Sequence, residues 1–340
     1  MKNMETEGLE EFASKADFRS TIRRLQQQLA KAKERNEELA EVTIQACKDA
    51  VLALGPLAPI PAPKADKRSP NAEVALWVLG DWQGAKRTTS YNTEVMQQRV
   101  AQYCNIAERF TEIHRAAHPV NDVCIIFGGD MLEGLFNFPT QPFEIDSTLF
   151  DQFVNVAELE AKVVRKALSI YERVTVIPEW GNHGRIGSKR DSVPRSDNFD
   201  RMAYELARRL LTGESRLTWQ DCPEDIQHLE VGNYRALVCH GDEVGRNGYV
   251  SRNAFINHVN RWKAGVHKWD FRDVYVAHYH QDAEEPLANG DGKIYWTGST
   301  ESDNRYANIM LAADARPSQR LHFIHGEKGI VTSRHQIYLD

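Results

Sequence analysis

Cysteine is scarce in this chain of 340 residues and shows no pairing pattern. A disulfide framework needs paired cysteines, and a structural zinc knuckle needs Cys-x-x-Cys spacing, so neither is expected. The widely spread and odd-numbered set instead favours a reducing compartment. The cysteines are Cys47, Cys104, Cys124, Cys222 and Cys239.

Long apolar runs are also missing. No stretch approaches the roughly 18 apolar residues from which a membrane span is predicted. The first residues, MKNMETEGLEEF, are too acidic and polar for a secretion signal. We therefore expect a cytoplasmic protein that does not enter a membrane.

An excess of positive charge is lacking as well. The 42 Lys and Arg against 48 Asp and Glu give a formal net charge of −6. Any contact with nucleic acid must therefore come from a local basic patch. The hydrophobic fraction of 41% is ordinary for a globular protein, and the length fits one large domain or two modest ones.

Residues 1–54 predict a helical, coiled-coil-like arm. Between residues 10 and 54, apolar and small residues recur at alternating spacings of four and three, with charged residues between them. Asn36 falls at an a position, where one polar residue can fix the register of a two-stranded coil. The arm would pair with a second copy or with a partner helix; alternatively, it is a single amphipathic helix packed on its own domain. The seam consists of Phe18, Ile22, Leu25, Leu29, Ala32, Asn36, Leu39, Thr43, Ala46 and Ala50.

A proline-rich linker follows at residues 55–72. Its stretch GPLAPIPAPKADKRSP holds five prolines and predicts an extended, semi-rigid spacer. From residue 73 onward, short β-prone runs alternate with amphipathic stretches near 92–117, 149–172 and 197–212, and strand-like runs dominate afterwards. This order predicts an α/β domain over residues 73–340 with a mixed sheet.

Metal-binding side chains follow five of the predicted strands. They come directly after the runs ALWVL, CIIF, VIPEW, YRALVC and VYVA. Because open α/β sheets bind ligands beside the carboxyl ends of their strands, we expect these side chains to meet. Carboxylate, imidazole and amide donors without thiolate suit Mn²⁺, Fe²⁺, Zn²⁺ or Ni²⁺. The residues are Asp81, Gln83, Asp130, Asn182, His183, His240, His278 and His280.

The segments GDWQ, GGDMLEG, GNHGR, CHGDE and AHYHQ, in this order, resemble the motifs of the calcineurin-like metallophosphoesterase superfamily. The resemblance covers about residues 73–326 and leaves the arm and the linker outside it. It implies a four-layer α/β/β/α sandwich with mixed sheets and two divalent metal ions, for which we favour Mn²⁺ over Fe, Zn, Ni or Mg. Two such ions can clamp a phosphoryl group and activate a water as the nucleophile.

The resemblance also implies how these side chains divide their roles. Asp130 bridges the two metals. His183 faces the substrate, where it stabilises the transition state or gives a proton to the leaving oxygen. The other ligands form two sets, which are Asp81, Gln83 and His280 for the first metal and Asn182, His240 and His278 for the second.

The sequence departs from the family pattern at two positions. Gln83 replaces a histidine of the first motif, so a neutral and weaker donor would help to hold the first metal. Gly184 replaces the acidic residue that follows the catalytic histidine, so no sequence neighbour orients His183. The candidates to orient it from elsewhere are Glu133, Asp191 and Asp242.

A basic stretch, GRIGSKRDSVPR, follows His183. Its Arg185, Lys189 and Arg190 would form a lip that holds the backbone of a polyanion beside the site; the alternative is a solvated loop. The tail at residues 295–326 resembles the end of DNA-repair nucleases of the superfamily, which phages and mobile elements often carry. DNA is therefore the predicted partner.

Three functions follow from these residues. The first hypothesis is a metal-dependent phosphodiesterase acting on DNA as an exonuclease or endonuclease. The second is a phosphatase or phosphodiesterase of nucleotides or phosphoproteins, because the metal core does not encode its substrate. The third is a non-catalytic metal-binding scaffold, which the departures at Gln83 and Gly184 motivate.

One more histidine pair stands apart from these motifs. His114 and His118, in the segment IHRAAHP, have the one-turn spacing of a helical metal-binding pair. No third ligand is near them in the sequence, so we interpret the pair as a solvated helix end.

Overall fold

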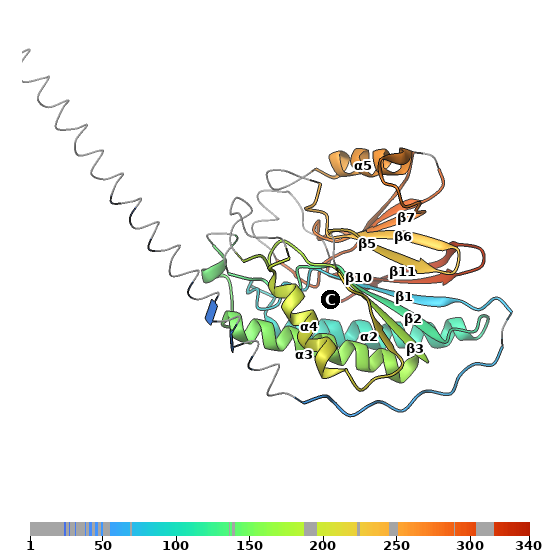
Figure 1. Cartoon of the computed structure of the whole chain (residues 1–340), viewed down its shortest axis with the longest axis horizontal. Coiled ribbons are helices and arrows are strands. Elements are labelled where there is room, and N and C mark those ends of the chain that lie inside the picture. The colour runs from blue at the N-terminus through green and yellow to red at the C-terminus, as the bar shows by residue number, and fades with distance from the viewer. Residues whose placement is uncertain are drawn as a thin grey trace, which may run out of the picture. The chain divides into compact units, whose positions relative to one another are not determined.

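The computed structural model (Figure 1) divides the chain into two compact units, Met1–Asp49 and Ala50–Asp340. It describes residues 55–68, 70–135, 137, 140–186, 196–222, 225–244, 251–288, 290–303 and 316–340, with scattered positions between 24 and 49. Those scattered positions are helical. Of the predicted heptad seam only Ala46 is among them, so the coiled coil stays a prediction.

The second unit contains two mixed β-sheets. The first sheet has the order β11-β10-β1-β2-β3-β4. Strands β1 to β4 run parallel to one another, and β10 runs antiparallel to both of its neighbours, β1 and β11. The second has the order β5-β6-β7-β9-β8, with a parallel centre of β6, β7 and β9. The strands are β1 (Val74–Leu79), β2 (Asp122–Phe127), β3 (Arg173–Pro178), β4 (Leu217–Trp219), β5 (Gln227–Val231), β6 (Tyr234–Cys239), β7 (Asp273–Val276), β8 (Ala283–Pro286), β9 (Lys293–Trp296), β10 (Ser318–His325) and β11 (Ile330–Tyr338).

The two sheets pack face to face and helices cover their outer faces, as Figure 1 shows. Along β1, Leu76 and Val78 point into the space between the sheets, whereas Trp77 points outward and contacts Tyr103 and Tyr171 edge-on. A strand buried on both faces reads as a continuous apolar run, which is why VALWVL shows no alternation. The predicted α/β class with mixed sheets is confirmed.

Each α-helix of the second unit begins at a side-chain cap. The side chains of Asn92, Thr148, Asn198 and Ser251 accept hydrogen bonds from backbone N–H groups of the first turn. Such caps place the helix starts locally, close to where the amphipathic stretches predict them. The helices are α2 (Thr93–Arg115), α3 (Leu149–Ile170), α4 (Phe199–Leu210) and α5 (Arg252–Arg261), with the short turns η1 (Gln141–Phe143) and η2 (Trp262–Val266).

The proline-rich segment is bound along the domain, and its role as a linker stays a prediction. Leu57 N–H donates to the carbonyl of Leu210, and Ile60 N–H donates to Glu214. Asp66 N–H donates to the side chain of Asn121. The segment 55–68 is therefore a strap on the second unit, which its proline content alone does not predict.

Several elements lie beyond the sequence prediction. Helix α5 and strands β4, β8 and β11 are not among the elements predicted from the sequence. One of the strand-like runs of the second half, NIMLAAD at residues 308–314, lies outside the described residues. Within the described residues, no helix is both long enough and apolar enough to cross a bilayer.

Candidate metal centre

The predicted metal ligands sit just past the carboxyl ends of strands from both sheets. β1, β2 and β3 of the first sheet lead into Asp81, Asp130 and Asn182, and β6 and β7 of the second lead into His240 and His278. Contacts of His240 with Asp130 and of His280 with Asp81 join the two sets of loops. The structure therefore brings these side chains together, and their role as metal ligands stays a prediction.

The backbone at these loops is strained. Five of the seven predicted ligands have a positive φ, between 49° and 65°, and none of them is glycine. Such a conformation costs on the order of 1–3 kcal/mol per residue, and strain of this kind clusters at functional sites. The five residues are Asp81, Gln83, Asp130, His278 and His280.

The first group of ligand atoms surrounds one oxygen of Asp130. His240 Nε2 lies 3.0 Å from Asp130 Oδ2 and 3.2 Å from His278 Nδ1. The Asn182 side-chain oxygen is 3.3 Å from the same His240 nitrogen. The nitrogen and oxygen atoms of Asp130, His240 and His278 all lie within 4.8 Å of one another, close enough to share one ion.

The second group also includes Asp130. His280 Nε2 is 3.5 Å from Asp81 Oδ1, and Gln83 Nε2 is 3.5 Å from Asp130 Oδ2. Donor atoms of Asp81, Asp130 and His280 again lie within 4.8 Å of one another. Asp130 is thus common to both groups, which is the position that a bridging carboxylate requires.

Two histidines of the centre are held in the tautomer that a metal ligand needs. His240 Nδ1 lies 2.8 Å from the carbonyl oxygen of Gly128, and His280 Nδ1 lies 3.2 Å from a carboxylate oxygen of Glu301. Each ring thereby holds its proton on Nδ1 and presents Nε2 to the centre. Sequence reasoning missed Glu301, because its partner is 21 positions away with no motif around it.

Unpaired buried oxygens show that a cation fits here. Neither carboxylate oxygen of Asp81 makes a hydrogen bond within the described part of the chain, and the side-chain oxygen of Gln83 makes none either. Both side chains are almost completely buried. A buried carboxylate that accepts no hydrogen bond is costly even with the His280 ring 3.5 Å away, so a divalent ion with oxygen and nitrogen ligands suits this donor set.

Charge on the centre shifts the histidine pKa values in opposite directions. Burial disfavours the charged ring of His240, but the Asp130 carboxylate outweighs burial and raises the pKa of His240 to about 10. Burial, and next the neighbouring His240, lower the pKa of His278 to about 3. The adjacent rings of His240 and His278 are therefore not both charged. His278 remains neutral, which is the form in which imidazole binds a metal.

His183 is oriented by Glu133. Its Nδ1 lies 3.1 Å from the backbone carbonyl oxygen of Glu133 and 3.2 Å from one carboxylate oxygen of the same residue, and the other carboxylate oxygen accepts from Lys86. Its Nε2 lies 3.9 Å from Asp130. Burial opposes protonation, but Asp130 and Glu133 outweigh it and raise the pKa of His183 to about 9. Of the three carboxylates considered from the sequence, Glu133 fills the role that Gly184 cannot.

Packing explains why position 184 is glycine. A Cβ atom there would lie 2.5 Å from the side-chain oxygen of Asn198 and 3.0 Å from the backbone nitrogen of Asp200. Asn198 is the cap of α4, so it cannot move away without losing that cap. An acidic residue after His183 is therefore sterically excluded in this chain.

Asp200 is a second residue that sequence reasoning missed. Its fully buried carboxylate accepts hydrogen bonds from the backbone N–H groups of Asp130, Met131, Leu132 and Gly181. It joins the loop after β2 to the loop after β3. Burial, and then the charge of Asp130, raise the pKa of Asp200 to about 6, against the effect of its backbone donors.

The predicted basic lip is described only at its first residue. Arg185 donates to Asp242, and only 13% of its side chain is exposed. Lys189, Arg190 and Asp191 lie outside the described residues. Substrate contact by Arg185, Lys189 and Arg190 stays a prediction.

Comparison with known proteins gives weak similarity in structure and none in sequence. No family model matches the sequence, and no curated protein is significantly similar to it. Vps29 from Entamoeba histolytica, complexed with Zn²⁺, is 11% identical over 78% of this chain and 99% of its own, with a TM-score of 0.36. Vacuolar protein sorting 29 from Cryptosporidium parvum is 12% identical over 78% of this chain and 99% of its own, with a TM-score of 0.36. A predicted phosphoesterase from Streptococcus pneumoniae is 10% identical over 78% of this chain and 98% of its own, with a TM-score of 0.30. Function must be argued from the centre itself.

Proposed function

We propose that this chain is a dinuclear-metal-dependent phosphoesterase of the calcineurin-like type. The observation that carries the proposal is the position of Asp130, which belongs to two ligand groups at once. A carboxylate shared by two ligand groups can bridge two metals about 3.5–4 Å apart, as in two-metal hydrolytic sites. His183, beside the shared carboxylate, supplies a group that can transfer a proton.

The residues present fit two divalent ions, for which Mn²⁺ remains our preferred identity. When bound, the ions would neutralise charge on the phosphoryl oxygens and supply an activated water. Asp130 would bridge them. The remaining donors divide into Asp81, Gln83 and His280 on one side and Asn182, His240 and His278 on the other.

His183 is the proposed proton donor to the leaving oxygen. Its backbone N–H donates to Asp130 at 2.7 Å, which fixes the main chain beside the centre. Glu133 holds Nδ1, so Nε2 faces the centre and carries the transferable proton. Lys86 neutralises Glu133 and is itself bound to Glu144, which keeps the Glu133 carboxylate in place. Because Glu133 replaces the missing acidic neighbour, the argument for a non-catalytic scaffold weakens.

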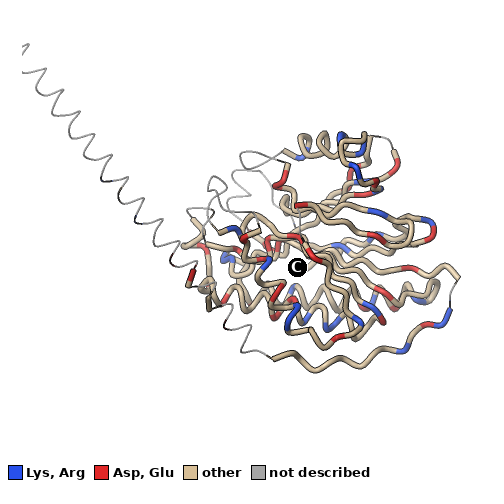
Figure 2. The backbone as a smooth tube through the Cα atoms, viewed as in Figure 1, with Lys and Arg blue, Asp and Glu red and all other residues tan. Residues whose placement is uncertain are grey.

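DNA is the substrate that we favour. The basic stretch after His183 and the nuclease-like tail support it, both from the sequence. Figure 2 shows Lys and Arg interspersed with Asp and Glu along the described chain. The Arg185–Asp242 ion pair favours the alternative, a phosphatase or phosphodiesterase of nucleotides or phosphoproteins, because it takes one cation from the lip.

His183→Ala is expected to leave two metals bound while lowering hydrolysis about 100-fold or more, since general acid catalysis contributes roughly that much. Metal content should be measured beside Mn²⁺-dependent cleavage of plasmid, linear and single-stranded DNA, bis-p-nitrophenyl phosphate and p-nitrophenyl phosphate. Glu133→Gln should show the same pattern in smaller measure. Both losses should be greater with DNA than with the nitrophenyl diester, whose leaving group departs without a proton.

Other results would separate the alternatives. Hydrolysis of the monoester alone would reject the nuclease and favour the phosphatase. Wild-type protein that binds metal but hydrolyses none of these substrates would favour the metal-binding scaffold. Loss of metal in His183→Ala would contradict the role given to this residue, because His183 is not among the proposed ligands.

The arm is proposed to join two copies of the chain through residues 10–54, or to bind a partner helix. Replacing both Ile22 and Leu29 by aspartate should convert a dimer to a monomer in analytical ultracentrifugation, because both are a positions of the heptad. Lys31→Asp is the matched control, since Lys31 is exposed. A wild-type monomer at micromolar concentration would contradict the homodimer.

A further inference from the structure

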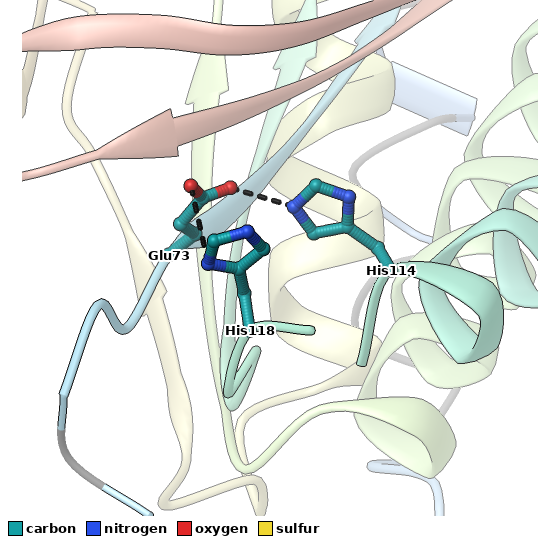
Figure 3. A group of neighbouring side chains, drawn as sticks. All are labelled: Glu73, His114 and His118. Carbon is teal, nitrogen blue, oxygen red and sulfur yellow. Dashed lines mark hydrogen bonds and ion pairs between the residues drawn. The ribbon is translucent and has the colours of Figure 1, made fainter. Parts of the chain in front are cut away.

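A third group of metal-ligand side chains lies away from the candidate centre (Figure 3). Glu73 directly precedes β1, His114 is in the last turn of α2, and His118 follows that helix. His114 Nε2 is 2.6 Å from Glu73 Oε2. His118 Nδ1 is 3.2 Å from the backbone carbonyl oxygen of Asn71 and 3.7 Å from Glu73 Oε1. The two imidazoles thus address different oxygens of one carboxylate.

This group is separate from the centre described above. Glu73 lies at the start of β1, whereas Asp81 follows its end. Six strand residues at about 3.3 Å each put roughly 20 Å between them. No residue is shared by the two sites, so binding at one can be tested independently of the other.

The histidine pair keeps its one-turn geometry beyond the end of the helix. The backbone N–H groups of Ala117 and His118 both donate to the carbonyl of His114, so the chain continues to turn after Arg115. The two imidazole rings lie nearly parallel, with centroids 5.1 Å apart and 25° between their planes. Two histidines at i and i+4 on one helical face can bind a single metal ion.

The ligands are also held from outside. The ring of Phe323 stacks on His114 at 3.8 Å between centroids. The hydroxyl of Thr332 donates to Glu73 Oε2 at 2.8 Å. Hydrogen bonds of this kind orient the carboxylate ligands of metal sites. Both partners come from β10 and β11, so the first sheet fixes the orientation of the group.

Charge favours a cation at this position. The Glu73 side chain is only 1% exposed, so its negative charge needs a nearby partner. A dication bound by both imidazoles and the carboxylate would supply that partner.

We propose that Glu73, His114 and His118 form a second metal site that binds Zn²⁺. Two imidazoles and one carboxylate are a known zinc donor set that leaves the fourth position for water. Their donor atoms lie within 4.8 Å of one another, and tetrahedral ligands about 2.1 Å from zinc lie about 3.4 Å apart, so small rotations suffice. The ion would tie the start of β1 to the end of α2.

The test counts zinc in the full chain. Native mass spectrometry of protein loaded with Zn²⁺ should show one ion fewer in His118→Ala than in wild type. His258→Ala is the matched control, because His258 is, like His118, a partly buried histidine, and it belongs to none of the three groups. The expected difference of one ion holds whether or not the candidate centre is loaded.

Affinity provides a second measurement. In an Asp130→Asn background, which removes the shared ligand of the candidate centre, chelator competition should show Zn²⁺ binding that His118→Ala weakens at least tenfold. Glu73→Gln should weaken it similarly, with folding checked by circular dichroism. Equal zinc counts in wild type and His118→Ala, including none in both, would overturn the proposal. Failure of the phosphoesterase proposal alone would leave one zinc in wild type and none in His118→Ala.

Discussion

Asp130→Asn is expected to lose both metal ions and to lower phosphodiester hydrolysis at least about 1,000-fold. The carboxylate belongs to both ligand groups, and an amide offers only one neutral oxygen in its place. Bound metals supply several kcal/mol of transition-state stabilisation, and each 1.4 kcal/mol is a factor of ten. No other single residue in the described groups reaches both metals.

Metal analysis and Mn²⁺-dependent hydrolysis of bis-p-nitrophenyl phosphate check this prediction. Asp122→Asn is the control, because Asp122 forms a surface ion pair with Arg173 at the other end of β2. Exposed pairs contribute little, so that variant should keep its metals and its rate. Two metals and a tenth or more of the wild-type rate in Asp130→Asn would contradict the bridging role.

Asp200→Ala is expected to lower the free energy of unfolding by about 3–5 kcal/mol. Four buried backbone N–H groups lose their acceptor, and each unsatisfied donor costs on the order of 1–3 kcal/mol, with partial relief from relaxation. Because these donors lie in the loops after β2 and β3, metal affinity should fall at least tenfold as well. The donors belong to Asp130, Met131, Leu132 and Gly181.

Urea unfolding of the metal-free protein measures the effect of Asp200→Ala without contribution from bound ions. Asp151→Ala is the matched control, because Asp151 is likewise an aspartate in the first turn of a helix but is exposed. It should cost only about 0.5–1 kcal/mol. Equal losses in the two variants would show that Asp200 acts only on its own helix.

Local sequence was enough to place the proposed ligands. Asp81, Asp130 and His240 each follow an apolar run that becomes a strand, and parallel strands bring their carboxyl ends to one edge. Helices α2 and α3 begin at caps whose side chain accepts a hydrogen bond from the backbone N–H three residues later, so the signal is local in the sequence. The short, polar strand β8 and the longer strand β11, with its polar centre, were not predicted. Helix α5 was not predicted either, although Ser251 caps it.

The residues that hold these ligands in place were harder to predict from the sequence. Glu133 was one of three candidates to orient His183, and only its position beside the ring singles it out. Asp200 and Glu301 were not considered, since their functional contacts cross between separate loops. The same holds for Glu73, which turns the pair His114 and His118, interpreted as a solvated helix end, into a three-ligand group.

By itself the sequence determined the α/β class, the strand ends and the identity of the donor atoms. These depend on apolar runs, caps and motifs, which are local in the chain. Only the tertiary structure decided that Asp130 is shared by two groups, that Asp200 joins two loops and that Glu73 meets two histidines. Those relations depend on distances between residues far apart in sequence, and packing of the two sheets and their helices sets such distances.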